Sequence, residues 1–213
     1  MDTEIIPWSS DAIRRAVRLL EAGEVVAFPT ETVYGLGARA DQPRAVRRIY
    51  EAKGRPHSVP LIVHLTDKSA ALPLAAVWSA AANKLADAFW PGSVTLVVKR
   101  AAVVIDEVTA GGDTVALRVP SHPVARQLLE SCDFPIVAPS ANPYGAAPPR
   151  TGEEVLRGLG GRIPLILDAG AVGVSVAARP SPSTIVDVTC EPPVVLRDGA
   201  VSRAELLAVV TVA

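Results

Sequence analysis

The sequence has few cysteine, histidine and aromatic residues: its 213 residues include two cysteines, three histidines and only 4% aromatic side chains. Cys132 and Cys190 lie far apart without a CxxC spacing, so no disulfide framework is expected and both are interpreted as reduced thiols. The histidines have no paired ligand spacing, which argues against a structural zinc site; they are His57, His64 and His122. We therefore predict no metal ion held by the protein itself.

The sequence also lacks an apolar run of about 18 residues and a basic leader followed by an apolar block. Opposite charges nearly cancel, with 21 Lys and Arg against 22 Asp and Glu. This balance excludes a highly basic, histone-like nucleic-acid binder, and 49% hydrophobic residues exclude a disordered chain. We expect one globular domain in the cytoplasm, with no membrane contact.

Helical and strand patterns alternate along the chain. Strands are predicted over 24–28, 60–65, 93–99, 114–119, 134–138, 164–168, 183–188 and 193–196. Helices are predicted from Ser10 or Asp11, from Asp41 with Pro43 in the first turn, over 75–90, over 121–132, and after two capping boxes, Thr151 with Glu154 and Ser202 with Glu205. A polar loop is expected over 29–37. The alternation predicts an α/β or α+β domain with helices packed on a central sheet. The pattern does not determine the order of the strands in that sheet.

Four charged or titratable residues stand out near the ends of predicted elements. Lys53 and Arg55 end a helix and enter a proline turn, so they could converge on one anion or merely complement the helix dipole. Arg118 lies inside an apolar strand, where its charge needs a partner or a ligand unless strand alternation points it to solvent. His64 ends another apolar strand and, taken alone, is most simply a structural histidine.

Polar groups also follow two buried strands. Ser140 and Asn142 close one of them at its carboxyl end, where ligands bind in open α/β sheets, although an Asx or Ser turn is an alternative. The segment 29–37, PTETVYGLG, offers hydroxyls, a carboxylate and a phenol but matches no phosphate-loop consensus. Ser183 and Arg197 add a hydroxyl and a cation. Without an evident nucleophile, His–Asp pair or metal cage, the set favours binding of polyanions and small polar substrates over covalent catalysis.

Seven segments occur in order between residues 29 and 187: PTETVYGLG, KGRP, PLIVH, WPGSVT, ALRVPSHP, APSAN and PSTIVD. Together they resemble the YrdC family, in its short form of single-domain threonylcarbamoyl-AMP synthases. The match runs from about residue 10 to residue 200. The resemblance implies a YrdC-like twisted mixed sheet with helices around it and a concave ligand-binding face, in a single domain over 1–213 without the further C-terminal domain of longer relatives.

The resemblance also implies an activity. A nucleotidyltransferase of this kind makes L-threonylcarbamoyl-AMP from L-threonine, bicarbonate and ATP with release of pyrophosphate, and Mg²⁺ would arrive with ATP. The reaction is the first step of threonylcarbamoyladenosine modification of tRNA. The implied partners are downstream threonylcarbamoyl transferase proteins, and a weak contact with tRNA itself stays open.

Site residues follow from the resemblance, position by position. The residues placed around the nucleotide phosphates and the reacting carbamate, and taken as catalytic, are Lys53, Arg55, Ser140 and Asn142. Further contacts to ATP would come from Thr114, Arg150 and Arg197. The threonine pocket would comprise Thr32, His64, Arg118 and Ser183, with Arg118 taking the amino acid's carboxylate. We expect Lys53→Ala to lower turnover far more than fold stability.

Two alternatives stay open. An RNA-binding domain without synthase activity is suggested by an arginine stripe on one helix, Arg44, Arg47 and Arg48, although Glu51 could pair with it and no aromatic RNA-stacking motif is present. A YrdC-like paralogue could instead act on another carbamoyl or carboxylate substrate. The presence of His64, Arg118 and Ser183, which would recognise the amino acid, favours threonine.

Overall fold

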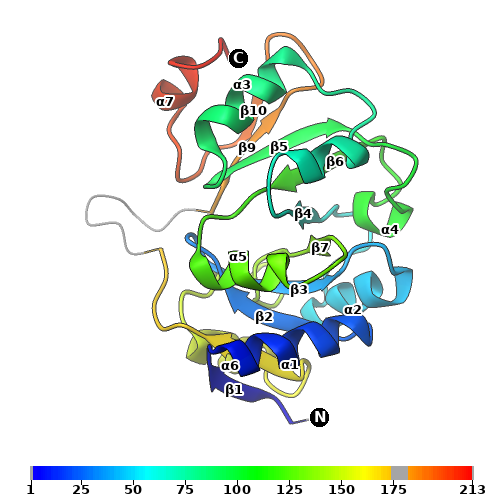
Figure 1. The fold of residues 1–213 in the computed structure, drawn as a ribbon, viewed down its shortest axis with the longest axis vertical. Coiled ribbons are helices and arrows are strands. Elements are labelled where there is room, and N and C mark those ends of the chain that lie inside the picture. Colours follow the sequence, from blue (N-terminus) through cyan, green and yellow to red (C-terminus); the bar gives the residue numbers. More distant parts are fainter. Residues whose placement is uncertain (1, 174–181, 213) are drawn as a thin grey trace.

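The computed structural model describes residues 2–173 and 182–212, whose strands form one mixed sheet (Figure 1). Its ten strands lie in the order β1-β8-β2-β3-β7-β4-β6-β5-β9-β10. The pairs β1–β8, β8–β2, β4–β6 and β5–β9 are parallel, and the other neighbours are antiparallel. The strands are β1 (Glu4–Pro7), β2 (Val26–Pro29), β3 (Tyr34–Arg39), β4 (Ile62–His64), β5 (Val94–Lys99), β6 (Thr114–Arg118), β7 (Ile136–Val137), β8 (Leu165–Asp168), β9 (Thr184–Asp187) and β10 (Val194–Arg197).

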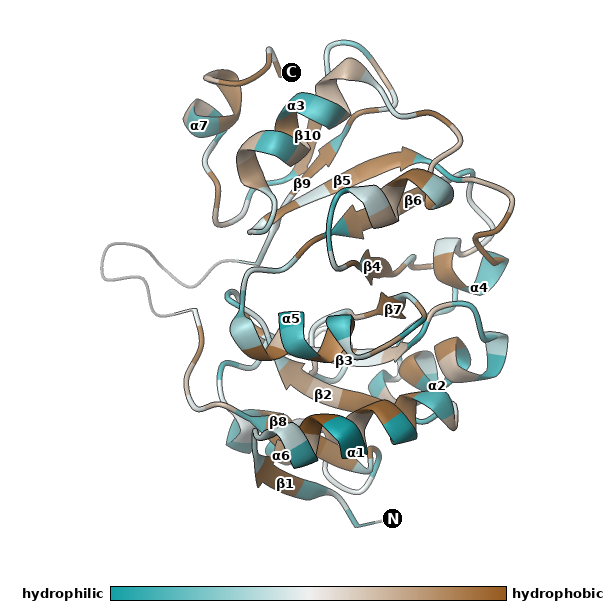
Figure 2. Cartoon of the chain, viewed as in Figure 1, coloured by the Kyte–Doolittle hydropathy of each residue, from teal (hydrophilic) through white to brown (hydrophobic). Residues whose placement is uncertain are grey.

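Helices cover both faces of this sheet. Successive residues of β2 enter different apolar clusters, because strand side chains point alternately to opposite faces: Val26 and Phe28 join one cluster and Ala27 the other. In Figure 2 much of β2 and β5 is brown, whereas α1 and α3 carry teal residues as well. The helices are α1 (Ser10–Glu21), α2 (Pro43–Lys53), the 3₁₀ helix η1 (Ser69–Leu74), α3 (Ala80–Phe89), α4 (Asp106–Thr109), α5 (Pro123–Glu130), α6 (Gly152–Leu159) and α7 (Arg203–Leu207).

The predicted mixed α/β fold is confirmed, but the expected loop over 29–37 is wrong in its second half. The chain turns back after β2, and the turn is closed by the Thr30 hydroxyl, which donates to the Val33 carbonyl at 2.6 Å. Strand β3 then runs antiparallel to β2. Gly37 lies in this strand opposite Val26, and a Cβ there would lie 2.7 Å from the Phe28 ring. Gly37 therefore allows a close approach between strands rather than a flexible loop.

Several element boundaries also differ from the prediction. The helix predicted over 75–90 begins only at Ala80, because Ser79 caps it and the preceding segment pairs with the end of β5, where Ala76 N–H donates to Lys99. The cap of α1 is Ser9 rather than Ser10 or Asp11. The short elements β1, η1 and α4 were not predicted.

Acidic residues near helix starts also behave differently from the expected caps. Asp41 does not open α2, since its carboxylate pairs with Arg39 while Pro43 occupies the first turn. Glu154 accepts from the Arg150 N–H rather than from Thr151, so the first capping box is only half formed. The second box, Ser202 with Glu205, is complete.

Candidate active site

A cavity of about 390 Å³ opens where the middle of the sheet meets the turn between β2 and β3. Parallel pairing of β4 with β6 sets His64 beside Arg118 at the carboxyl ends of both strands. Seven of the predicted site residues line the cavity: Thr32, Arg55, His64, Arg118, Ser140, Ser183 and Arg197. The sheet therefore gathers side chains from segments far apart in the sequence, as expected for the carboxyl end of an open sheet.

Arg118 is buried, with only 5% of its side chain exposed. Its Nε donates to the Gly92 carbonyl at 3.1 Å, and its Nη2 donates to the Glu31 carboxylate at 2.6 Å and to the Thr32 hydroxyl at 3.2 Å. Within residues 2–173 and 182–212, Nη1 has no hydrogen-bond partner. The guanidinium is thus held on one edge while another nitrogen stays free for a ligand in the cavity.

His64 packs edge-on against the Phe28 ring, and its Nδ1 is buried with no partner among the described residues. Burial, together with the nearby charge of Arg118, lowers the pKa of His64 to about 3. The imidazole is therefore neutral at physiological pH. A buried nitrogen without a partner is costly and is most simply explained by a polar ligand that completes its hydrogen bonding.

The end of α2 aims Arg55 at the cavity. Gly54 adopts the left-handed conformation with φ 61°, which ends the helix and turns the chain back, so Arg55 N–H donates to the Tyr50 carbonyl. The Arg55 side chain then donates to the carbonyls of Val59 and Pro60 and lies over the Tyr144 ring. Burial lowers the pKa of Arg55, although the group stays charged at neutral pH.

Lys53 lies behind the cavity wall rather than on it. Its Nζ donates to the carbonyl oxygens of Ser140 and Asn142, the latter at 2.6 Å. The Asn142 amide in turn donates to the carbonyls of Pro143 and Ala146, while its Oδ1 is buried without a partner among the described residues. The turn after β7 is thus fixed from both sides. Burial, and then the charge of Arg55, lower the pKa of Lys53 to about 7.

Ser183 and Arg197 form the far wall of the cavity. The Arg197 guanidinium donates to the Ser183 carbonyl, with Nη2 at 2.7 Å, and to the Ser183 hydroxyl at 3.0 Å. That hydroxyl lies 2.8 Å from the hydroxyl of Thr95, so Ser183 is held by two neighbours. Burial, with a smaller contribution from Arg118, lowers the pKa of Arg197.

Two predicted nucleotide contacts do not line the cavity. Thr114 begins β6, two residues from Ala116 and four from Arg118, so the three share one face of the strand. Arg150 donates to the carbonyls of Val172 and Gly173, immediately before the residues outside the described part of the chain. The segment that connects Asp168 to Ser183 is therefore described in two pieces, one up to residue 173 and one from residue 182 onwards.

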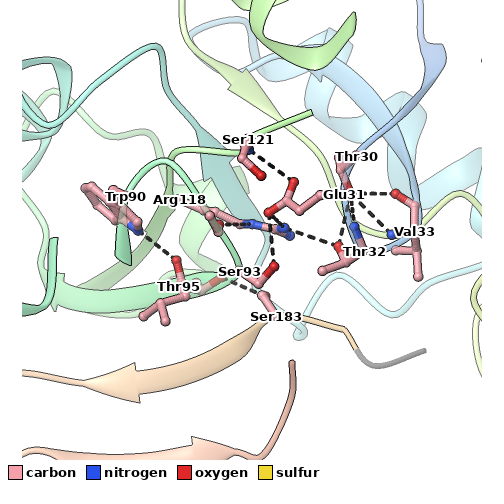
Figure 3. Close-up of polar contacts among 12 residues, drawn as sticks. Thr30, Glu31, Thr32, Val33, Trp90, Ser93, Thr95, Arg118, Ser121 and Ser183 are labelled. Carbon is pink, nitrogen blue, oxygen red and sulfur yellow. Dashed lines mark hydrogen bonds and ion pairs between the residues drawn. The ribbon is translucent and has the colours of Figure 1, made fainter. Parts of the chain in front are cut away.

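Glu31 is the site residue that the sequence did not single out. Figure 3 shows its carboxylate between Arg118, Ser93 and Ser121. Burial acts to raise the pKa of Glu31, but the charge and hydrogen bond of Arg118, together with backbone hydrogen bonds that include the Ser121 N–H, hold the pKa below its usual value. The available signal was Arg118 itself, because an arginine in an apolar strand needs a partner and a carboxylate precedes Thr32 in the buried turn.

Neither a metal centre nor a membrane segment is found among the described residues. Within residues 2–173 and 182–212, no group of three or more His, Cys, Asp and Glu side chains could hold a metal ion. In the same part of the chain, no helix is long and apolar enough to cross a bilayer.

Comparisons with known proteins agree with the fold. The family model described as "Telomere recombination", which covers Sua5, YciO and YrdC, matches residues 18–199. The threonylcarbamoyl-AMP synthase of Bacillus subtilis is 43% identical over 209 residues, which is 98% of this chain and 59% of that protein. The protein of the same name from Pyrococcus abyssi is 44% identical over 194 residues, covering 91% of this chain and 56% of the relative.

Structural comparison gives a similar result. The crystal structure of P. abyssi Sua5 complexed with L-threonine superposes with a TM-score of 0.90 at 39% identity, over 100% of this chain and 62% of that one. The fold and the cavity define a mixed α/β protein with a cavity lined by three arginines. The chain belongs to the Sua5, YciO and YrdC family. It spans less than two thirds of the length of the relatives described here.

Proposed function

We propose that this chain makes L-threonylcarbamoyl-AMP from L-threonine, bicarbonate and MgATP. The amine of threonine and bicarbonate give a carbamate and water, and a carbamate oxygen then attacks the α-phosphorus of ATP. The bond from that phosphorus to the bridging oxygen breaks, and pyrophosphate leaves with the electron pair. A relative described as a threonylcarbamoyl-AMP synthase and a superposable structure bound to L-threonine support this assignment.

The observation that carries the proposal is the pairing of His64 with Arg118 in one buried corner of the cavity. The free Nη1 of Arg118 suits a carboxylate, and the neutral imidazole of His64 suits a hydroxyl or amine without adding a competing charge. The hydroxyls of Thr32 and Ser183 line the same cavity. A β-hydroxy amino acid matches this set of groups.

The other wall suits a triphosphate. Arg55 and Arg197 are cations on the cavity surface, and Ser140 supplies a hydroxyl between the turn and the strands. Negative charge grows on the leaving pyrophosphate in the transition state, so fixed cations accelerate the reaction without a protein nucleophile. The cavity lining includes no carboxylate, so Mg²⁺ would enter with ATP and keep phosphate and water ligands.

The remaining predicted residues take supporting roles in the proposal. Lys53 and Asn142 hold the turn that carries Ser140, and the buried Oδ1 of Asn142 is free to accept a bond from a ligand or a water. Thr114 and Arg150 would contact the nucleotide beyond the cavity. Because the product is a reactive mixed anhydride, a transferase that delivers the carbamoyl group to tRNA is the expected partner.

The test is to incubate the purified protein with MgATP, L-threonine and bicarbonate, omit each in turn, and follow pyrophosphate and the adenylate by mass spectrometry. The proposal requires the adenylate only when all three are present. Arg55→Met should lower the rate at least about tenfold, whereas Arg47→Met, which removes an exposed cation paired with Glu107, should not. ATP binding without product from threonine would favour a paralogue acting on another carboxylate.

RNA binding as the main role has less support. Of the arginine stripe on α2, Arg47 pairs with Glu107 and Arg48 pairs with Glu24, so two of the three cations already have carboxylate partners. Salt-dependent binding of tRNA by a preparation that makes no adenylate would favour this alternative.

A further inference from the structure

We propose that Glu31 is a positioning residue that fixes the Arg118 guanidinium so that Nη1 meets the substrate carboxylate. The inference rests on the proposed function, because it assigns Glu31 to recognition of the amino acid in the same cavity. It differs from the roles proposed above, since Glu31 would act through Arg118 rather than by touching the substrate.

The Glu31 carboxylate joins three segments of the chain. Its Oε1 accepts from Arg118 Nη2 at 2.6 Å and from the Ser93 hydroxyl at 3.1 Å, and its Oε2 accepts from the Ser121 N–H at 3.1 Å. Ser93 directly precedes β5, Arg118 is the last residue of β6, and Ser121 follows β6 (Figure 3). The side chain is only 20% exposed. A carboxylate with three donors and this degree of burial is itself tightly oriented.

This arrangement determines which part of Arg118 stays free. The guanidinium is planar and rigid, so fixing Nε on Gly92 and Nη2 on Glu31 also fixes the direction of Nη1. Both hydrogens of Nη2 are used, one by Glu31 and one by Thr32. A substrate carboxylate would therefore bind the Nη1 side, in one defined orientation.

Loss of Glu31 would have two opposite effects. The negative charge of Glu31 offsets part of the Arg118 charge, so its removal should strengthen the attraction for a carboxylate. Its removal also leaves a guanidinium that is 5% exposed without its only carboxylate partner among the described residues. Such a group reorients towards other acceptors, and a misplaced donor loses more binding than the extra charge adds. We expect the positional effect to dominate.

The decisive variants are Glu31→Ala and Glu31→Gln, assayed by adenylate formation with L-threonine and with L-threonine amide. The amide lacks the carboxylate but keeps the amine and the hydroxyl. In the wild type, kcat/KM should be much higher for threonine than for the amide. Glu31→Ala should reduce this ratio about tenfold or more, mainly through the KM for threonine, with the KM for ATP changed less than about twofold.

Glu31→Gln separates position from charge, because its amide oxygen still accepts from Arg118 while the charge is gone. It should keep the threonine-to-amide ratio within about threefold of the wild type. Ser93→Ala removes one neutral hydrogen bond to Glu31 and should lower the ratio about twofold to threefold. This milder variant keeps the inference testable if Glu31→Ala does not fold.

Glu107→Gln is the matched control, because it removes a carboxylate from the exposed ion pair with Arg47 and should leave the ratio unchanged. A lower KM for threonine in both Glu31 variants would overturn the inference, since charge would then dominate. Equal effects on the KM values for ATP and threonine would overturn it as well, because that pattern marks a general structural role. If the wild type makes no adenylate with threonine, the proposed function fails, and the inference falls with it.

Discussion

The ammonium nitrogen of Lys53 lies 2.6 Å from the carbonyl oxygen of Asn142, and it also donates to the carbonyl of Ser140. The last residue of α2 therefore holds the turn after β7 against the cavity. Lys53 is only 3% exposed, so loss of its side chain leaves the Asn142 carbonyl without a donor among the described residues, while the Ser140 carbonyl keeps the bond from the Asn142 N–H. This changes the expectation from the sequence alone, because Lys53→Ala should now cost fold stability as well as turnover.

The first prediction concerns that stability. We expect Lys53→Met to lower the free energy of unfolding by about 2 kcal/mol, because the Asn142 carbonyl loses its donor and the Ser140 carbonyl loses one of two. Urea denaturation followed by circular dichroism measures the change. Lys68→Met is the matched control, since Lys68 is paired with Asp87 on the surface and its loss should cost less than about 1 kcal/mol. Equal stability of the wild type and Lys53→Met would refute the structural role.

The second prediction is a pH dependence. Burial and the charge of Arg55 lower the pKa of Lys53 from its usual 10.5 to about 7 in the folded protein. Between these values the unfolded chain binds more protons, so this group stabilises the fold increasingly as pH rises from 7 to 10, by at most about 1.4 kcal/mol per pH unit. The stability difference between the wild type and Lys53→Met should therefore grow over pH 7, 8 and 9. A difference that stays constant would contradict the lowered pKa.

Periodicity predicted the fold class and most long elements, because the buried residues of α1 or β6 recur at spacings set by local geometry. Periodicity failed to predict the elements whose structure is determined by tertiary contacts. Strand β3 contains two glycines and was taken for a loop, yet Gly37 is needed beneath the Phe28 ring. The short strand β1 is defined by its pairing with β8, a partner about 160 residues away that no local pattern contains.

The candidate site was predicted largely through family resemblance, and its chemistry in part from Arg118 alone. A charge in an apolar strand predicted a partner or a ligand, and Arg118 has both the carboxylate of Glu31 as its partner and a nitrogen left free for a ligand. The role of Lys53 was not visible, because its partners are backbone carbonyls and no sequence pattern specifies them. The resemblance placed His64 and Arg118 in one pocket, but no local pattern could show that the two residues pair directly across neighbouring strands.

The third prediction concerns Tyr34, which anchors the end of β8. Its hydroxyl lies 2.9 Å from the Asp168 carboxylate and 2.8 Å from the Gly170 carbonyl, and it accepts from the Ala169 N–H at 3.0 Å. We expect Tyr34→Phe to lower the free energy of unfolding by about 1–2 kcal/mol, because the ring stays while these bonds are lost. Tyr144→Phe, at a side chain that is half exposed, should change it by less than about 0.5 kcal/mol. Urea denaturation of the wild type and both variants measures these changes. Equal denaturation midpoints for the wild type and Tyr34→Phe would refute the anchoring role of the Tyr34 hydroxyl.

The fourth prediction separates the two ends of the cavity through Arg197. Its guanidinium holds Ser183 through the backbone carbonyl and the hydroxyl, a fork that lysine cannot reproduce. We expect Arg197→Lys to raise the KM for ATP about tenfold, because a fixed cation near the phosphates is lost, and to raise the KM for threonine less. Steady-state kinetics with each substrate varied in turn measures both values. Arg157→Lys, on an exposed face of α6, should change neither. A rise confined to the KM for threonine would instead assign Arg197, with Ser183, to the amino-acid end.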